Sequence, residues 1–173
     1  MFAQQERIGC VGAKLLYPDD TIQHAGLGFG FLTLAAHMHK NFQVSNPGYM
    51  GRLIYAHDVY GVTGACLMIR RELYQQVGGL DESFAVAFND VDFCVRVRNA
   101  GYQNVFTPFA MLYHYESKSR GLDESPEKRA RFVSEVKRFQ ARWKKELAAG
   151  DPCLNPNFDL DRDDFRIKLQ PLE

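Results

Sequence analysis

The sequence lacks any long apolar run. None of its 173 residues lies in a stretch close to the ~20 consecutive apolar residues that a membrane-spanning helix needs. Residues 1–7 place no apolar stretch between the first charges and a cleavage site, so they lack the pattern of a secretory leader. We therefore expect a cytoplasmic protein without a transmembrane segment.

The sequence also lacks a charge excess and a cysteine pattern. Its 21 Lys and Arg residues balance 21 Asp and Glu residues, so nothing in the composition indicates a nucleic acid or an anionic membrane as partner. The four cysteines stand singly and show neither a zinc spacing nor a disulfide framework. An apolar content of 46% in a chain of this length favours one hydrophobic core over two.

The hydrophobic pattern predicts strands interrupted by helices. The stretch at 29–58 has no period and is interpreted as an ordered loop. No glycine-rich phosphate loop follows an N-terminal strand, so the chain looks incomplete as a nucleotide-binding fold. The expected class is α/β, with a mixed sheet and flanking helices. The expected elements are a hairpin at 8–16 and 21–28, strands at 59–69, 102–107 and 110–115, and helices at 70–77, 90–100 and 126–147, the last capped by Ser125.

A polar cluster, Asn89-Asp90-Val91-Asp92, follows an apolar run and begins a helical pattern. As a helix start it is well explained, because Asn is a favoured N-cap and acids in a first turn gain ~0.3–1 kcal/mol from the helix dipole. Alternatively, one carboxylate faces a site and acts as a general base, kept ionised by the helix N-terminus. Spacing alone favours the cap. Asp92 and Arg96 have the i, i+4 spacing of a supporting pair on the outer face of this helix.

Histidines and a few basic positions offer weaker signals. His114 ends an apolar strand, where a neutral imidazole could ligate a divalent metal, although a lone histidine is more often structural. His37 and His39 lack a third ligand and are interpreted as solvated or structural, and His24 gives no signal. Arg120 lies in a hydroxyl-rich loop that could meet a phosphate or simply be solvated. The stretch Gln140-Ala141-Arg142-Trp143 is one residue short of the QxxRW motif of processive polysaccharide synthases, and is interpreted as helix surface with a core Trp.

Several ordered motifs resemble the C-terminal half of family 2 glycosyltransferases, in particular rhamnosyltransferase-like enzymes of bacterial surface polysaccharides. They lie at residues 61–71, 78–82, 89–96, 101–102, 107–108 and 114–121. The resemblance implies a partial GT-A fold whose nucleotide-binding half would precede Met1. It also implies that residues 1–150 form the acceptor-side portion of a glycosyltransferase domain, and that residues 151–173 form an extended tail.

The resemblance also assigns roles to individual residues. Asp90 matches the catalytic base, and Asn89 replaces the usual Glu beside it. Asp92 matches a second acid, which either orients the helix start or contacts the acceptor. Gly64 and Ala65 match a strand end that lines the acceptor side.

Enzymes of this family use a nucleotide-diphosphate sugar and a divalent metal, Mn or Mg, and transfer the sugar to a saccharide acceptor with inversion. His114 matches the histidine that can ligate the metal. The DxD motif that holds metal and diphosphate is missing, because Asp90-Val91-Asp92 belongs to the base motif. The expected function is thus that of a glycosyltransferase fragment.

Two alternatives remain. One is a non-catalytic module with a degenerate glycosyltransferase fold that binds a glycan or a partner protein. The other, a metal-dependent hydrolase, is weaker because no ligand cluster is evident. We also expect apolar surface where the missing half would pack, which would favour a homodimer or association with that half.

Overall fold

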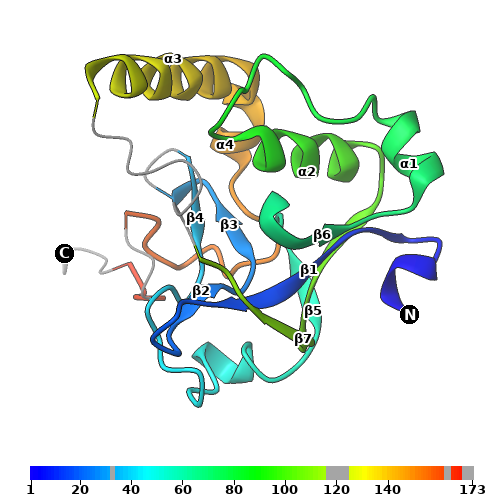
Figure 1. Cartoon of the computed structure of the whole chain (residues 1–173), viewed down its shortest axis with the longest axis vertical. Coiled ribbons are helices and arrows are strands. Elements are labelled where there is room, and N and C mark those ends of the chain that lie inside the picture. Colours follow the sequence, from blue (N-terminus) through cyan, green and yellow to red (C-terminus); the bar gives the residue numbers. More distant parts are fainter. Residues whose placement is uncertain (32–33, 116–124, 162–164, 169–173) are drawn as a thin grey trace, which may run out of the picture.

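The computed structural model describes residues 1–31, 34–115, 125–161 and 165–168. Figure 1 shows the α-helices along one side of the molecule, with the strands of two sheets beneath them. The larger sheet has the order β2-β1-β7-β5, with β6 also pairing with β1, and the smaller sheet joins β3 to β4. The strands are β1 (Ile8–Leu16), β2 (Ile22–His24), β3 (Leu27–Phe29), β4 (Ala35–His37), β5 (His57–Val59), β6 (Leu67–Met68) and β7 (Gln103–Tyr113).

Strand β1 is the centre of the larger sheet. It pairs antiparallel with β2, which confirms the predicted hairpin as far as residue 24, whereas residues 27–29 pair with β4 instead. It also pairs parallel with β7, from Ile8 opposite Gln103 to Leu16 opposite Tyr113. Nearly every position of β1 is buried, as expected of an interior strand. A Cβ at Gly12 would come within 2.5 Å of Val62, so only glycine allows the chain after β5 to pass this close.

The strand predicted over residues 59–69 is wrong. β5 ends at Val59, a 3-10 helix spans Gly64–Cys66, and only Leu67–Met68 pairs again with β1. Met68 is 65% exposed, so the segment is not buried on both faces as its apolar composition indicated. The reason for the break lies in side chains that take the backbone N–H groups of residues 62–64, described below.

Strand β7 replaces the two short strands expected on either side of Pro108. Thr107 lies opposite Ala13 and Met111 lies opposite Lys14, so residues 108–110 bulge out of the ladder with β1. A bulge accommodates a proline, which has no N–H to donate. The proline therefore distorts the strand without ending it.

The C-terminal part of β7 exposes large apolar side chains. β5 pairs only with residues 104–106, and no other described strand lies along that edge further on. Phe109 is 75% exposed, and Met111, Leu112 and Tyr113 are each about half exposed. This confirms that apolar surface is exposed; whether another part of the protein packs there stays a prediction.

The helices are close to those predicted. They are α1 (Arg71–Gln76), α2 (Asn89–Asn99), α3 (Pro126–Arg142) and α4 (Lys144–Ala149). The predicted single helix over 126–147 is broken, because Trp143 leaves helical geometry and separates α3 from α4. Among the described residues, no helix combines the length and the apolar character required to cross a membrane.

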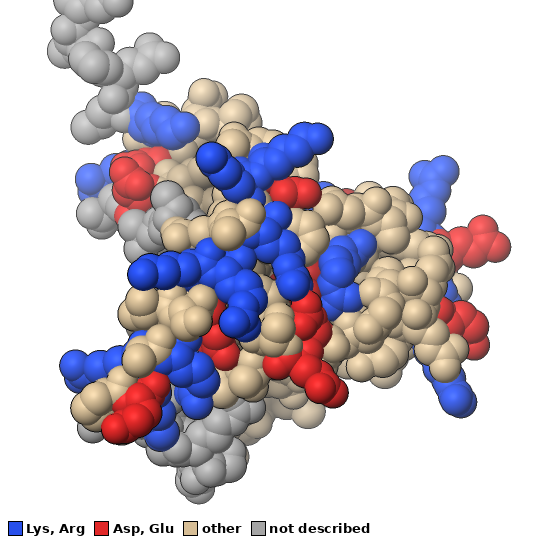
Figure 2. Space-filling view, turned by 90° about the horizontal axis from the view of Figure 1, so that it is seen from above, with Lys and Arg blue, Asp and Glu red and all other residues tan. Residues whose placement is uncertain are grey.

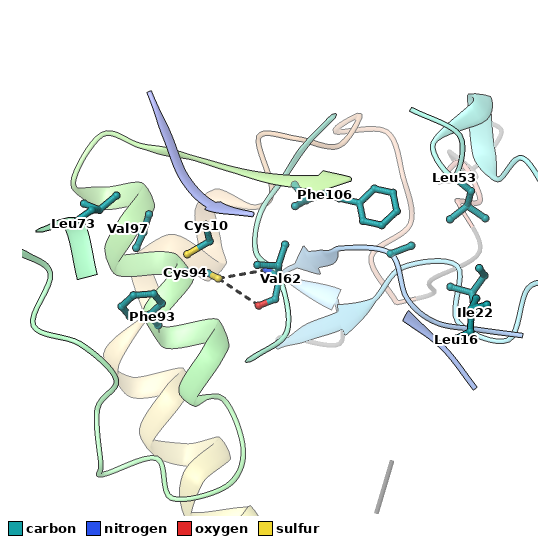
Figure 3. Close-up of a cluster of buried hydrophobic side chains, with 12 residues drawn as sticks. Cys10, Leu16, Ile22, Leu53, Val62, Leu73, Phe93, Cys94, Val97 and Phe106 are labelled. Carbon is teal, nitrogen blue, oxygen red and sulfur yellow. Dashed lines mark hydrogen bonds between the residues drawn. The ribbon is translucent and has the colours of Figure 1, made fainter. Parts of the chain in front are cut away.

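The core has two main parts, one on each side of α2. The first fills the space between α2 and the larger sheet, where Cys10, Val62, Phe93, Cys94 and Phe106 meet (Figure 3). The second joins α2 to α3 and β3 through the buried side chains of Phe29, Phe84, Val95, Phe139 and Trp143. Helix α2 is therefore packed on two faces, and its first turn is held firmly in place.

The start of α3 gives a direct test of the predicted cap. The Ser125 hydroxyl accepts a hydrogen bond from the Lys128 N–H at 3.2 Å, and Pro126 follows it. We expect Ser125→Ala to lower the free energy of unfolding by about 1 kcal/mol, because one N–H of the first turn loses its partner. Urea denaturation measures the change. Ser134→Ala, at an exposed position within the same helix, is the control and should change stability by less than about 0.5 kcal/mol. Equal effects would contradict the assignment of the cap.

Residues of the tail fold back on the rest of the chain. The Asp151 carboxylate accepts hydrogen bonds from the N–H groups of Phe29, at 3.0 Å, and Cys153, at 2.7 Å. Phe158 and Phe165 are buried against the loop after β3 in a small third cluster. The described part of the tail consists mainly of turns, with one bridge between Phe158 and Ile167. The division of the chain at residue 150 stays a prediction.

His39, buried beside this cluster, makes stability depend on pH. Its Nε2 accepts the Tyr49 N–H at 3.1 Å, and burial, followed by the charge of Arg52, lowers the pKa of His39 to about 4. In the unfolded chain its pKa returns to ~6.5. The unfolded state therefore binds more protons between pH 6.5 and 4, so stability is lost as the pH falls through this window.

We expect the urea midpoint to fall from pH 6.5 to pH 4, and His39→Gln to reduce the part of this fall that His39 causes. Glutamine keeps an acceptor for the Tyr49 N–H but does not titrate. Burial also lowers the pKa of His57 to about 4, so His57 contributes to the fall of the urea midpoint that remains in His39→Gln. Urea unfolding curves at several pH values measure this for both proteins. If the urea midpoint of His39→Gln depends on pH as steeply as that of the native chain, His39 is not one of the causes.

Figure 2 shows the molecule from the side of α3, with Lys and Arg gathered over this face and acidic side chains between them. Basic residues outnumber acidic ones in α3. The balanced charge of the whole chain therefore hides a local concentration of positive charge. Part of it is used internally, since Arg138 donates to the Ser83 carbonyl and Arg142 binds two acids.

Candidate active site at the start of helix α2

The predicted polar helix start is confirmed in the first turn of α2, but the N-cap lies one residue earlier than predicted. The N-cap is Phe88, in a left-handed conformation (φ 66°), and the predicted cap Asn89 is the first helical residue. The Asn89 side-chain oxygen accepts the Asp90 N–H at 2.7 Å, and Asp90 Oδ1 accepts the Val91 N–H at 2.9 Å. Side chains within the turn thus satisfy two of its free N–H groups.

The second oxygen of Asp90 leaves the helix and binds the neighbouring loop. Oδ2 accepts the Gly64 N–H at 2.9 Å, and a Cβ on Gly64 would lie 3.4 Å from the Asp90 Cβ. Asp90 is half-buried, whereas Gly64 and Ala65 are exposed. The structure therefore brings Asp90 beside Gly64 and Ala65, three residues that the resemblance assigned to one site.

Three side chains hold the backbone of residues 62–64, which we call the 62–64 segment. The Val62 N–H donates to Cys94 Sγ at 3.4 Å (Figure 3), the Thr63 N–H donates to His24 Nε2 at 3.3 Å, and the Gly64 N–H donates to Asp90. Because these N–H groups bind side chains, they cannot form a sheet ladder. This explains why an apolar, strand-like sequence does not continue as a strand here.

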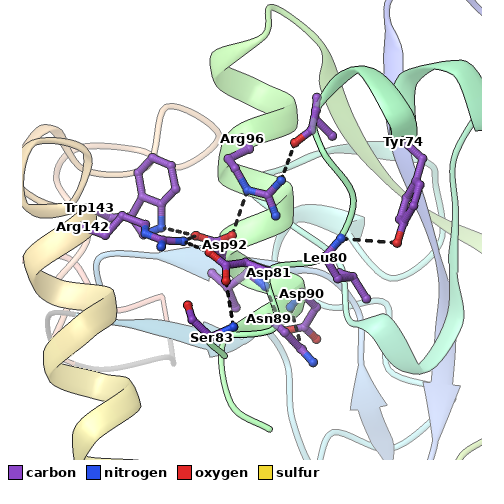
Figure 4. A network of polar contacts seen from close by, with 12 residues as sticks. Tyr74, Leu80, Asp81, Ser83, Asn89, Asp90, Asp92, Arg96, Arg142 and Trp143 are labelled. Atoms are coloured by element: carbon purple, nitrogen blue, oxygen red, sulfur yellow. Dashed lines mark hydrogen bonds and ion pairs between the residues drawn. The ribbon is translucent and has the colours of Figure 1, made fainter. Parts of the chain in front are cut away.

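Asp92 lies at the centre of a buried polar network that joins α2 to α3 (Figure 4). Its Oδ2 accepts from Arg96 Nε at 2.9 Å, and its Oδ1 accepts from Arg142 at 2.9 Å and from Trp143 Nε1 at 3.0 Å. The predicted i, i+4 pair with Arg96 is confirmed, but its placement on the outer face is wrong, because the Asp92 side chain is fully buried. Its contacts are those of a residue that orients the helix. Contact with an acceptor stays a prediction.

Arg142 connects this network to the loop before α2. It binds Asp81 at 2.6 Å as well as Asp92, and these hydrogen bonds raise the pKa of Arg142. Hydrogen bonds from Ser83 and then from Arg142 hold the pKa of Asp81 well below its usual range. Residues 140–143 were interpreted as helix surface with a core Trp. This is confirmed for Trp143, which is buried, but Arg142 also binds the two acids Asp81 and Asp92.

Glu135 anchors the chain immediately before α2, a role that no sequence pattern indicated. Its buried carboxylate accepts the Val86 N–H at 3.2 Å and the Ala87 N–H at 2.9 Å. Glu135 lies on α3, 48 residues along the chain, at a position that resembles any helix-surface acid. Only the packing of α3 against the loop identifies its role.

His24, His37 and His114 lie near one another. His24 is fully buried, and its Nδ1 lies 3.0 Å from Nδ1 of His37, so His37 is structural, as one of its two interpretations held. Burial, and then the charges of His37 and His114, hold the pKa of His24 well below its usual value. His114 is half-buried, and its Nδ1 has no hydrogen-bond partner in the described part of the chain. Arg120 lies outside the described residues.

The Nδ1 of His114, unpartnered among the described residues, is a buried atom, and a neutral imidazole nitrogen is a common metal ligand. However, within the described ranges no three His, Cys, Asp or Glu residues converge on a point that could hold a metal ion. The residues described here therefore do not form a metal site of their own, and the ligand role of His114 stays a prediction.

The curled mixed sheet and the helices α1 to α4 form an α/β fold consistent with that of glycosyltransferases, and Asp90 lies at the start of α2. The chain belongs to the glycosyl transferase family group 2, whose family model matches residues 28–148. The resemblance drawn from the motifs is thereby confirmed at the level of the family.

Individual relatives agree with this assignment. The chain is 52% identical over 164 residues to the uncharacterized protein y4gI of Sinorhizobium fredii, a match that covers 94% of this chain and 18% of the relative. It is 34% identical over 173 residues to the O-antigen biosynthesis protein RfbC of Myxococcus xanthus, covering 98% of this chain and 13% of the relative.

A shorter match reaches an N-acetylglucosaminyl-diphospho-decaprenol L-rhamnosyltransferase of Mycobacterium tuberculosis. It is 39% identical over 62 residues, which are 36% of this chain and 20% of the relative. In these three comparisons the match spans a fifth or less of the relative's length.

Proposed function

We propose that this chain is the acceptor-side part of an inverting glycosyltransferase of polysaccharide synthesis, in which Asp90 is the general base. The observation that carries the proposal is the contrast between the two acids of the helix start. Asp92 has both oxygens engaged inside the protein, whereas Asp90 is half-exposed beside the exposed Gly64 and Ala65. The family and the O-antigen relative support the part of the proposal that concerns sugar transfer in polysaccharide synthesis.

Asp90 retains the capacity to take a proton. Each of its oxygens accepts one backbone N–H, from Val91 and from Gly64, and an ionised carboxylate oxygen has a second lone pair. The two N–H groups fix the direction of the carboxylate without occupying it. A base held in this way needs no reorganisation when the acceptor hydroxyl arrives.

In the proposed reaction, the acceptor hydroxyl oxygen attacks the anomeric carbon of a nucleotide-diphosphate sugar. The bond from that carbon to the diphosphate oxygen breaks, the hydroxyl proton moves to Asp90, and the configuration at the anomeric carbon inverts. Gly64, Ala65, Asn89 and the helix oriented by Asp92 would position the acceptor. In this proposal the donor site belongs to protein outside this acceptor-side part, and His114 would supply one ligand to a divalent metal held there.

The test is transfer by the full-length protein. With UDP- and dTDP-sugars and saccharide acceptors, we expect release of the nucleoside diphosphate together with a glycosylated product, detected by mass spectrometry. Calorimetry on this chain alone should show no donor binding. If the full-length protein binds glycans but transfers no sugar from any donor, the proposal is wrong and the chain is a non-catalytic glycan-binding module.

A further inference from the structure

The pattern of hydrogen bonds around the 62–64 segment points to a residue that the sequence left without a role. Each N–H of this segment has one side-chain acceptor, and the acceptor for Thr63 is His24. The next N–H, that of Gly64, binds the Asp90 carboxylate. His24 and Asp90 therefore hold consecutive peptide groups of the same chain segment.

The contacts of His24 fix its tautomer. Its Nε2 accepts two backbone N–H groups, from Gly26 and Thr63, each at 3.3 Å, so this nitrogen carries no proton. The proton of the neutral ring is consequently on Nδ1, where it is donated to His37 Nδ1 at 3.0 Å. His37 must then carry its own proton on Nε2. The two rings meet edge to face, with centroids 5.0 Å apart.

We propose that His24 is a positioning residue for the Asp90 carboxylate, acting through the 62–64 segment. The side chain is fully buried on β2, far along the chain from α2. Without an acceptor at Nε2, the Thr63 N–H would be buried and unpaired, which is costly enough to displace the segment. The Gly64 N–H would then move away from Asp90 Oδ2. The inference rests on the proposed role of Asp90 only for its effect on catalysis.

The first test needs no catalysis. Nitrogen-15 spectra of the imidazoles in this chain should show His24 as the Nδ1–H tautomer at pH 7. Amide exchange should show a protected Gly64 N–H in the native chain and in His24→Gln, whose side-chain oxygen can replace Nε2 as acceptor. His24→Leu should lose at least tenfold of that protection. An Nε2–H tautomer, or a Gly64 N–H equally protected in both variants, would overturn the proposal.

The second test uses the full-length protein. We expect His24→Leu to lower kcat at least tenfold with the donor KM within twofold, and His24→Gln to recover kcat to within threefold of the native value. If His24→Leu does not fold, His37→Gln and His37→Leu replace it, because only glutamine keeps an acceptor for the His24 Nδ1–H. Equal kcat in the acceptor and non-acceptor variants would overturn the proposal. Tautomer and exchange results as expected, with no transfer by the native protein, would instead contradict the proposed function alone.

Discussion

Replacing Asp92 with alanine is expected to lower the free energy of unfolding by about 3 kcal/mol. The substitution removes the acceptor of three donors at once, on Arg96, Arg142 and Trp143. Breaking a buried pair by removing one partner typically costs ~3–5 kcal/mol, because the remaining charge stays behind without compensation. We expect the lower end of that range, since the side chains of Arg96 and Arg142 keep 22% and 35% of their exposure and can recover some hydration. Urea unfolding followed by circular dichroism measures the effect.

Asp81 provides the matched control, because it binds the same guanidinium from a more exposed position. Its side chain is 30% exposed, compared with 0% for Asp92. Asp81→Ala should therefore cost less than about 1 kcal/mol, as is usual for a pair near the surface. Similar costs for Asp81→Ala and Asp92→Ala would mean that Asp92 does not hold α2 and α3 together in the way described.

Replacing Asp90 with asparagine in the full-length protein is expected to lower kcat by ~10²–10⁴-fold, the usual contribution of a positioned general base. Asparagine has nearly the same shape, and its side-chain oxygen can still accept the Gly64 N–H. It cannot take up a proton from the acceptor hydroxyl at neutral pH. The change therefore removes the base and keeps the bond to the Gly64 N–H, while the Val91 N–H loses its side-chain acceptor. Chromatography of the released nucleoside diphosphate measures kcat.

Asn89→Ala is the control for the helix start. It removes the hydrogen bond to the Asp90 N–H but leaves the Asp90 carboxylate unchanged. We expect kcat to fall less than tenfold and the stability of the chain to fall by about 1 kcal/mol or less. If Asn89→Ala lowers kcat as much as Asp90→Asn, the loss reflects disruption of the turn and the role of Asp90 as base is not supported.

The elements that could be predicted are those whose signal is local. Ser125 and Pro126 predict the start of α3, and the apolar runs around the turn after residue 16 predict the β1–β2 hairpin. No local signal showed that residues 59–69 do not form a strand. Their composition favours a strand, but side chains of His24, Asp90 and Cys94, distant in the sequence, take the N–H groups that a ladder would need. Long-range packing overrides local preference here.

In the candidate site, too, some residues can be recognised from the local sequence and others only from the packing of distant elements. Asp90 could be singled out as a candidate because an acid at a helix start is visible in the sequence and matches a family motif. The burial of Asp92 could not, because an i, i+4 pair with Arg96 is equally compatible with a solvated face. Glu135 and Arg142 lie on α3 and act on the loop and turn around the start of α2, so their roles depend on how two helices pack. Local spacing carries no information about that packing.

The most direct measurement is single-turnover transfer by the full-length Asp90→Asn protein with the donor already bound, because it separates the chemical step from donor binding. We expect a donor Kd within twofold of the native value and a transfer rate at least 100-fold lower. A transfer rate within tenfold of the native rate, at full donor occupancy, would contradict the assignment of Asp90 as the base.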